Sequence, residues 1–234
     1  MKIGILEAEN LKSELVEKFG GYSDMTQRLL SAIEPQLMFE THAVINGEYP
    51  QDINQCDAWL VTGSKASAYD EADWIRQLAL FIQKLAGQQK KLIGICFGHQ
   101  LIAQALGGKV EKSNKGWGVG IMTSDVVCHK AWMQPMRQAF ALLVSHQDQV
   151  VELPPQAERI AGNDFCINSS YQINKHILCF QGHPEFSVAY ARQSMDGRRT
   201  LLGEDTYRQA QASLNKPIDE QLIAAWILNF IQAR

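Results

Sequence analysis

The sequence predicts an α/β fold with a mostly parallel central sheet, helices on both faces of that sheet and a small antiparallel layer. Short apolar runs at 56–62 and 92–95 are typical of strands that are buried on both faces of a parallel sheet. Each run is followed by a segment with helical spacing of apolar residues, and such alternation of strands and helices characterises α/β folds. From residue 107 onward the pattern changes to short strands and glycine turns, which predicts the antiparallel layer.

The first half of the chain is predicted to build the parallel sheet and its helices. The expected segments are strand 1–6, a helix within 9–21, helix 23–33, strand 37–42, strand 56–62, helix 72–86, strand 92–95 and helix 100–106. Ser23 is the expected N-cap of the second helix, and Gly20 is the expected end of the first. Reactive groups gather at the carboxyl ends of parallel strands, so Gly63 and Cys96 are predicted to be neighbours.

The second half is predicted to add the antiparallel layer and a helical tail. The expected segments are strands at 118–123, 140–145, 158–167 and 177–180, followed by helices at 188–202, 206–214 and 219–231. No linker rich in proline or serine separates these segments from the first half, so residues 1–234 are expected to form a single domain. The motifs described below lie within 1–186, and the helical tail 187–234 carries none that we can place.

Composition argues against several classes of protein. Apolar residues make up 46% of the 234 residues and charged residues 20%, as in an ordinary globular protein. A net charge of −3, with no basic run longer than a pair, argues against nucleic acid as a partner. The chain has neither an apolar stretch of membrane-spanning length nor a signal peptide at its start, so we expect no membrane partner and a cytoplasmic location. The five cysteines lack metal-binding spacing, so we expect reduced thiols and no metal.

One cysteine lies where strand 92–95 meets the helix that follows it. A nucleophile on such a sharp turn is held away from its own backbone, and Gly94 and Gly98, two residues to either side of Cys96, relieve the crowding at the turn. The helix beyond points free N–H groups and the positive end of its dipole at the sulfur, which favours the thiolate. Cys96 is therefore predicted to be a nucleophile, against the alternative that it is an ordinary packed cysteine.

A histidine and a glutamate two residues apart follow strand 177–180. Alternate side chains of an extended segment point the same way, so His183 and Glu185 can lie side by side. Such a pair can act as a base and as the group that orients the base. The oxyanion formed during amide cleavage would be stabilised by two backbone N–H groups, those of Phe97 and Ser64.

Two segments carry a resemblance to a known family, GICFGHQ at 94–100 and QGHPEF at 181–186. They resemble the nucleophile signature and the histidine–glutamate signature of the class I glutamine amidotransferases, and the chain looks like a stand-alone member similar to the amidotransferase domain of GMP synthase and to the γ-glutamyl peptidases. The resemblance implies a flavodoxin-like fold, a catalytic triad of Cys96, His183 and Glu185, and no cofactor.

The resemblance also implies a site for the amino-acid end of the substrate. The corresponding positions in this chain are Gly63, Gln100, His146, Gln147 and Asp148. Asp148 is expected to pair with the substrate ammonium group, and Gln100 to offer an amide. The alternative for His146 and Asp148 is a capped loop that binds no ligand.

The loop after strand 56–62 departs from the family pattern. Where the family usually has Gly-Gly-Pro followed by serine, this chain has Ser64 in place of the second glycine and Lys65 in place of the proline. If the second position needs a positive φ, a serine there is strained. The loop is therefore expected to differ from the family in shape or in substrate.

The predicted activity is hydrolysis of the γ-amide of glutamine or of a γ-glutamyl compound through a γ-glutamyl thioester on Cys96. Glu185 is followed by about 50 residues, in which we expect no nucleotide-binding module. Either a separate synthetase subunit then receives the ammonia, or the protein is a stand-alone γ-glutamyl hydrolase or peptidase. The alternative from another class is a non-catalytic binding or regulatory protein that retains the fold, and an enzyme that uses a metal or a nucleotide ranks third.

Overall fold

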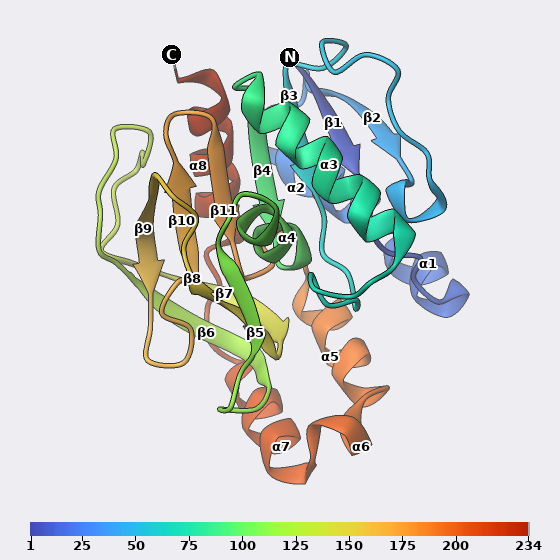
Figure 1. Ribbon diagram of the computed structural model, residues 1–234. Coiled ribbons are helices and arrows are strands. Elements are labelled where there is room, and N and C mark those ends of the chain that lie inside the picture. Colours follow the sequence, from blue (N-terminus) through green and yellow to red (C-terminus); the bar gives the residue numbers. More distant parts are fainter. Residues whose placement is uncertain (234) are drawn as a thin grey trace.

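The computed structural model describes residues 1–233, and nine of the strands in this range form one mixed sheet (Figure 1). In their order across the sheet, the strands are β2 (Met38–His42), β1 (Lys2–Leu6), β3 (Ala58–Val61), β4 (Lys91–Ile95), β11 (Ile177–Phe180), β10 (Ser170–Ile173), β9 (Ala157–Gly162), β6 (Gly118–Val126) and β7 (Ala139–His146). Neighbours from β2 to β11 are parallel, and neighbours from β11 to β7 are antiparallel. A separate antiparallel sheet pairs β5 (Lys109–Lys112) with β8 (Asp148–Glu152). The predicted α/β fold class is confirmed, and most of the antiparallel strands continue the main sheet.

Helices cover both faces of the parallel part of the sheet. Within residues 1–233 the helices are α1 (Ser13–Phe19), α2 (Tyr22–Ile33), η1 (a 3₁₀ turn, Val44–Asn46), α3 (Asp73–Gly87), α4 (Phe97–Ala105), α5 (Val188–Asp196), α6 (Arg199–Leu202), α7 (Glu204–Ser213) and α8 (Glu220–Gln232). Residues of α2 and α8 share one hydrophobic cluster with the sheet, and residues of α3 and α4 share another. Figure 1 shows α3 and α4 in front of the parallel strands, with α2 and α8 behind them.

The two hydrophobic clusters explain why the central strands have apolar side chains at successive positions in the sequence. Successive side chains of a strand point to opposite faces of the sheet. In β4, Leu92 packs in the cluster with α3 and α4, whereas Ile93 and Ile95 pack in the cluster with α2 and α8. Because both faces are covered, every position from Leu92 to Ile95 is buried.

The predicted start of α2 is wrong. The N-cap is Gly21, and its backbone N–H donates to the Asp24 carboxylate at 2.8 Å. Ser23 lies inside the first turn of the helix, where its backbone N–H donates to the Glu7 carboxylate at 2.9 Å. The N–H groups in the first turn of a helix have no acceptor within the helix, and for Ser23 the acceptor is Glu7, which directly follows β1.

Two other predicted boundaries are also wrong. The strand expected at 158–167 ends at Gly162, because the Asn163 side chain accepts the backbone N–H groups of Phe165 at 3.0 Å and Cys166 at 2.7 Å and so closes a turn. The helix expected at 188–202 is two helices, α5 and α6, which are separated at Gly197 and Arg198.

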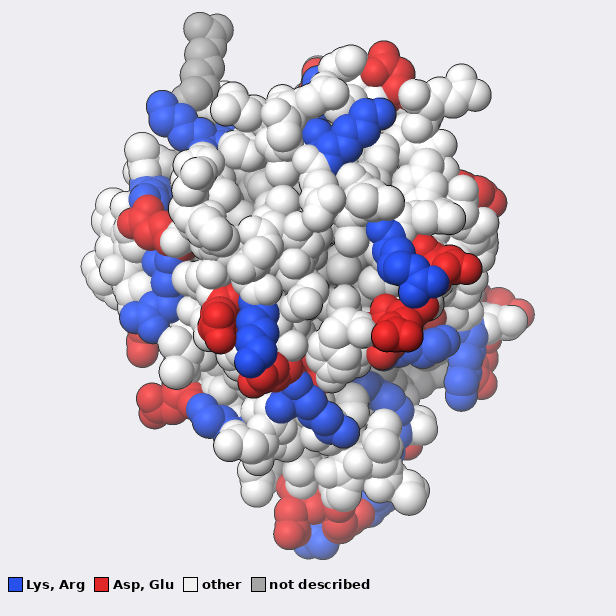
Figure 2. Space-filling view, viewed as in Figure 1, with Lys and Arg blue, Asp and Glu red and all other residues white. Residues whose placement is uncertain are grey.

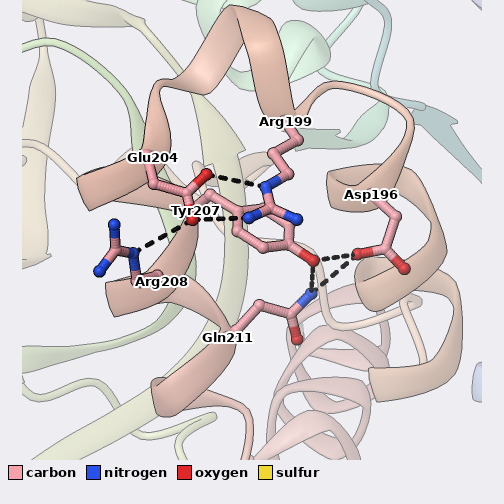
Figure 3. Close-up of polar contacts among 6 residues, drawn as sticks. All are labelled: Asp196, Arg199, Glu204, Tyr207, Arg208 and Gln211. Carbon is pink, nitrogen blue, oxygen red and sulfur yellow. Dashed lines mark hydrogen bonds and ion pairs between the residues drawn. The ribbon is translucent and has the colours of Figure 1, made fainter.

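A polar network at the surface joins the three helices α5, α6 and α7 (Figure 3). The Glu204 carboxylate accepts from Arg199 at 2.8 and 2.6 Å and from Arg208 at 3.1 Å. The Asp196 carboxylate accepts from the Tyr207 hydroxyl at 2.6 Å. Exposed pairs of this kind each contribute little to stability, because water screens their charges. The network therefore links the three helices to one another but adds little to the stability of the fold.

The helical tail is bonded to β6 and to the edge strand β7. The Ser213 hydroxyl accepts the N–H of Ile121 at 2.9 Å, and Asp219 exchanges two hydrogen bonds of 2.8 Å with the backbone of Ala141. Arg198 donates to the Ser145 hydroxyl at 2.6 Å, one residue before the end of β7. The tail thus supports the strand that leads into the predicted substrate loop.

The charged surface is mixed. Figure 2 shows Lys and Arg side chains interspersed with Asp and Glu over the visible face, and the chain as a whole carries a net charge of −3. No helix in the described part of the chain is both long enough and apolar enough to cross a membrane.

Candidate active site

Cys96 occupies the corner between β4 and α4. Its backbone N–H donates to the Phe180 carbonyl at 2.9 Å, which continues the pairing of β4 with β11 by one residue. Its φ of 51° and ψ of −102° are rare for a residue with a side chain, so the turn stores strain. The residue is the N-cap of α4 and is 5% exposed. The thiol therefore lies at the positive end of the helix dipole, as the sequence predicts.

The glycines on either side of Cys96 are required by close packing. A Cβ atom at Gly94 would lie 2.7 Å from Cδ1 of Ile102 and 2.8 Å from the backbone of Gly98. A Cβ atom at Gly98 would lie 2.4 Å from the Val61 carbonyl oxygen. The first turn of α4 therefore packs directly on the ends of β3 and β4, and the two glycines leave room for this approach.

His183 and Glu185 follow β11 and are in contact with each other. The backbone N–H of His183 donates to the Leu143 carbonyl at 2.7 Å, which anchors this segment to β7. Nδ1 of His183 lies 2.7 Å from Oε1 of Glu185, and both side chains are 3% exposed. The Phe186 ring stacks on the imidazole with centroids 3.8 Å apart and planes 9° apart. Glu185 and Phe186 thus hold the ring in one orientation.

The charge environment of His183 favours its protonated form. Burial lowers the pKa of His183, but the negative charges of Cys96 and Glu185, together with hydrogen bonds to both side chains, outweigh burial and raise the pKa to about 10. Because Glu185 occupies Nδ1, the other ring nitrogen is the one available to Cys96. A buried imidazolium between a sulfur and a carboxylate is an arrangement that supports nucleophilic catalysis by a thiolate.

We expect a pH dependence of stability from this histidine. A raised pKa means that His183 stabilises the fold fully below its ordinary pKa of about 6.5, and that this contribution is lost as the pH rises to about 10. The slope attributable to one such group approaches about 1.4 kcal/mol per pH unit within this window. In Glu185→Gln one of the two negative partners is gone, so we expect the free energy of unfolding, measured with urea from pH 7 to 10, to fall less steeply than in the wild type. Equal slopes in the two proteins would contradict this assignment.

The loop after β3 lies against both reactive side chains. A Cβ atom at Gly63 would be 2.8 Å from Cε1 of His183 and 3.7 Å from Cβ of Cys96, so the predicted proximity of Gly63 to Cys96 is confirmed. Within residues 1–233, Gly63 and Ser64 are absent from the positions with positive φ. The position therefore does not need a positive φ, and the condition under which Ser64 would be strained is not met. Glycine is needed at 63 for space next to the imidazole and not for its backbone angles.

A buried glutamate explains how the loop accommodates Lys65. The Lys65 backbone N–H, which a proline would lack, donates to Oε2 of Glu9 at 2.8 Å, and its Nζ donates to Oε1 at 3.1 Å. The Glu9 side chain is 4% exposed and the Lys65 side chain 83% exposed. The exposed ammonium contributes little, whereas the hydrogen bond from the backbone to a buried carboxylate is of the strong class.

Replacing Glu9 is accordingly expected to destabilise the loop. We expect Glu9→Ala to lower the free energy of unfolding by about 1–3 kcal/mol, because the Lys65 backbone N–H loses its charged acceptor. Lys65→Met is the matched control: it retains the N–H and removes only the exposed ammonium, so a change within about 0.5 kcal/mol is expected. Urea unfolding of both variants measures the difference, and equal losses in the two would refute this explanation.

The predicted substrate residues surround the start of β8. The Asp148 carboxylate accepts from the Ser67 hydroxyl at 2.6 Å and from the Tyr69 hydroxyl at 3.0 Å. The Asp148 carbonyl accepts from Nε2 of Gln100 at 2.8 Å and lies 2.9 Å from Nδ1 of His146. The structure therefore brings Gln100, His146 and Asp148 together, with each carboxylate oxygen of Asp148 held by one hydroxyl.

Gln147 is the single residue between β7 and β8. Its backbone carbonyl accepts the N–H of Ser113 at 2.9 Å, and its side chain is half-buried. Phe97 begins α4, so its backbone N–H has no acceptor within the helix and is directed beyond the helix end. These positions are compatible with the predicted roles, which for both residues depend on backbone groups.

Several residues next to the site were missed by the sequence analysis. Glu9, Ser67 and Tyr69 reach the loops described above from distant segments. Tyr22 of α2 lies against the site from the other side, with its ring 6.3 Å from His183 and 5.3 Å from Phe186. Glu9, Tyr22 and Tyr69 sit in segments with no recognisable motif, so the sequence carried no signal that would single them out. Ser67 belongs to the loop compared above with the family pattern, but that pattern does not indicate its contact with Asp148. The described residues contain no group of three or more His, Cys, Asp or Glu placed to hold a metal ion.

Comparisons with known proteins bear on the family and the fold of this chain. A family model described as glutamine amidotransferase class-I matches residues 22–196, about three quarters of the chain, from the start of α2 to the end of α5. Gamma-glutamyl peptidase 2 of Arabidopsis thaliana is 31% identical over 234 aligned positions, which cover 95% of this chain and 92% of that protein. The matching subunit of the glutamine-hydrolyzing GMP synthase of Methanospirillum hungatei JF-1 is 37% identical over 103 positions, 43% of this chain and 54% of that protein. The crystal structure of a glutamine amidotransferase from Thermotoga maritima has the same fold, with a TM-score of 0.75 over 98% of this chain and 96% of that one at 17% identity.

Proposed function

This chain belongs to the class I glutamine amidotransferase family, and from that premise we propose that it hydrolyses the γ-amide bond of a γ-glutamyl compound through a γ-glutamyl thioester on Cys96. The observation that carries the proposal is the position of His183, between the Glu185 carboxylate at 2.7 Å and the Cys96 thiol, with Gly63 against the imidazole. A base, its orienting carboxylate and a strained nucleophile at a helix N-terminus are the parts that thiol-dependent amide cleavage needs.

In the proposed first step, the Cys96 thiolate attacks the side-chain carbonyl carbon of the glutamyl group. The resulting oxyanion accepts hydrogen bonds from the backbone N–H groups of Phe97 and Ser64. The His183 imidazolium then gives its proton to the departing nitrogen, the C–N bond breaks, and ammonia or an amine leaves. What remains is a γ-glutamyl thioester on Cys96 and a neutral His183.

In the proposed second step, water hydrolyses the thioester. His183 takes one proton from the water while the water oxygen attacks the carbonyl carbon of the thioester. The tetrahedral intermediate then collapses and releases the Cys96 thiolate. Glutamate is released, and the imidazolium–thiolate pair is restored. Glu185 keeps the same imidazole orientation in both steps, so a single histidine serves as acid and then as base.

The same proposal assigns the amino-acid end of the substrate to the loops around Asp148. Its carboxylate, held by two hydroxyls, is placed to pair with the α-ammonium group. Gly63, Gln100, His146 and Gln147 form the rest of this site, with Gln100 and His146 acting through the Asp148 carbonyl that they contact. None of these residues is assigned a contact with the group beyond the scissile bond.

The extent of the similarities favours a peptide or other γ-glutamyl compound over glutamine. The match to gamma-glutamyl peptidase 2 covers nearly all of both chains, including the helical tail, whereas the match to the GMP synthase subunit covers 43% of this chain. That GMP synthase subunit nevertheless supports a second candidate, in which this protein hydrolyses glutamine and a separate synthetase subunit uses the ammonia. A single chemistry at Cys96 serves both candidates.

Release of glutamate tells the two candidates apart. The purified protein is offered a γ-glutamyl peptide and, separately, glutamine. We expect turnover of the peptide with kcat/KM at least about tenfold above that of glutamine, a difference of about 1.4 kcal/mol in transition-state stabilisation. The reverse preference would favour the candidate with a synthetase partner. Failure to cleave either compound, under conditions in which a glutamine-like electrophile does not modify Cys96, would favour a non-catalytic protein and contradict the proposal.

A further inference from the structure

A small internal cavity lies behind the predicted substrate loop. Its volume is about 10 Å³, which is room for about one water molecule. The walls come from β6, β7, the turn 163–169 and the segment Gln181–Gly182 that leads into His183. Most of the side chains that line it are buried. An occupant of the cavity therefore contacts both β7, which leads to Asp148, and the segment that leads to His183.

Two buried polar atoms belong to residues that line this cavity and have no hydrogen-bond partner among the described residues. They are Nε2 of His146 and Nε2 of Gln181. His146 is 4% exposed and Gln181 is 1% exposed. A buried donor or acceptor without a partner is costly, so two such atoms around one small cavity call for a polar occupant.

The hydrogen bonds around the cavity determine which atom donates and which accepts. Nε2 of Gln100 donates to the Asp148 carbonyl at 2.8 Å and to Oε1 of Gln181 at 3.0 Å. The oxygen of the Gln181 amide is thus occupied, and the group left over is its NH₂ donor. Nδ1 of His146 faces the same Asp148 carbonyl at 2.9 Å, and a carbonyl accepts, so Nδ1 carries the proton.

The remaining nitrogen of His146 is an acceptor. Burial lowers the pKa of His146 to about 4, so the ring is neutral at ordinary pH. With its proton on Nδ1, Nε2 presents a lone pair to the cavity. One donor and one acceptor therefore belong to the same cavity, and a water molecule can satisfy both at once.

We propose that this cavity binds one structural water molecule, which accepts a hydrogen bond from Nε2 of Gln181 and donates one to Nε2 of His146. The water closes a ring of hydrogen bonds that runs through Gln181, Gln100, the Asp148 carbonyl and His146. Its second proton is available to the hydroxyls of Ser124 and Ser169, which line the same cavity and are bonded to each other at 2.8 Å. Each link in the ring then has one donor and one acceptor.

The ring connects the two parts of the site that lie far apart in the sequence. Gln181 is two residues before His183, and His146 is two residues before Asp148. The water therefore fixes the predicted ammonium-binding loop relative to the segment of the predicted base. The presence of the water is independent of the proposed function, whereas its effect on substrate binding rests on that function.

A first experiment detects the water in the wild-type protein. A crystal structure at a resolution that shows ordered waters is expected to place one within hydrogen-bond distance of both nitrogen atoms. In solution, the Gln181 side-chain amide protons are expected to show nuclear Overhauser contacts to water. A site without density and without such contacts, or a nitrogen of Gln181 bonded directly to His146, would overturn the proposal whether or not the protein is an enzyme.

A second experiment measures what the water does. Gln181→Met removes, at similar size, both the donor to the water and the acceptor of Gln100. We expect KM for the γ-glutamyl substrate to rise about tenfold or more, the equivalent of one to two lost hydrogen bonds, with kcat changed less than about threefold. Gln172→Met is the matched control: this glutamine of β10 is also buried, but it does not line the cavity, and its oxygen accepts from Trp132. The control is expected to retain the wild-type KM. An unchanged KM in a folded Gln181→Met variant would refute the positioning role of the water. An inactive wild-type protein would instead refute the proposed function, and the first experiment alone would then decide whether the water is present.

Discussion

Replacing Cys96 by alanine is expected to reduce glutamate release from the preferred γ-glutamyl substrate by about 10⁴-fold or more, because no other group at the corner of β4 and α4 can form the thioester. The neighbouring groups remain in place, so substrate binding is expected to persist. Steady-state kinetics give the loss of turnover, and binding of the uncleaved substrate to the variant gives the retained affinity.

Two control variants separate chemistry from folding. Cys128→Ala changes a half-buried cysteine whose sulfur contacts the Glu158 carboxylate, away from the site, and is expected to keep activity within about threefold. Cys96→Gly is expected to be as inactive as Cys96→Ala but about 1 kcal/mol more stable, because glycine adopts a φ of 51° without strain. Activity in either variant at Cys96 close to that of the wild type would show that the nucleophile is elsewhere.

Gly63→Ala carries the second largest expected effect. The added Cβ would lie 2.8 Å from Cε1 of His183, so the imidazole or the loop must move by several tenths of an ångström. Displacement of a catalytic group on this scale is expected to lower kcat by about 10²-fold. Because Gly63 does not have a positive φ, the substitution itself adds no backbone strain.

Gly87→Ala is the matched control for this effect. Gly87 ends α3, and a Cβ atom there would meet nothing within 4 Å. Alanine has the higher helix propensity, so we expect unchanged kcat and a gain of up to about 1 kcal/mol in stability. If Gly63→Ala turned over as fast as Gly87→Ala, the imidazole would not lie against the loop as described.

The centre of the candidate site could be predicted because its parts are local in sequence. A strand that runs directly into a helix places Cys96 at a sharp corner, and the close approach that requires Gly94 and Gly98 occurs within that same turn. His183 and Glu185 meet because they are two residues apart on extended backbone. In both cases the chain direction over a few residues determines which side chains meet.

The residues that hold the loops of the site in place could not be predicted, because they come from distant segments. Tyr69 and Ser67 contact Asp148 across 79 and 81 positions, and Glu9 contacts Lys65 across 56. No periodicity of apolar residues encodes which of many exposed hydroxyls or carboxylates will meet a given loop. Whether position 64 needs a positive φ was likewise left open by the sequence, because the contacts of this loop with Glu9 and His183 come from distant segments.

The antiparallel strands were predicted least well. β5 has four residues with one buried side chain, and β10 has four buried residues, two of them polar. Segments this short give neither an alternating nor a continuous apolar signal, and pairing with β8 or β11 determines their structure. The break between α5 and α6 likewise occurs at Gly197 and Arg198 within a stretch of helical periodicity, where Arg198 bonds to Ser145 of β7.

The central claim is that Cys96 carries the γ-glutamyl group during turnover, and trapping that intermediate tests it most directly. The wild-type protein is mixed with excess γ-glutamyl peptide, quenched in acid within the first turnovers, digested and analysed by mass spectrometry. We expect a glutamyl adduct on the peptide that contains Cys96, and its disappearance in Cys96→Ala. Release of glutamate by the wild type with no adduct at Cys96, or with an adduct on another residue, would contradict the account.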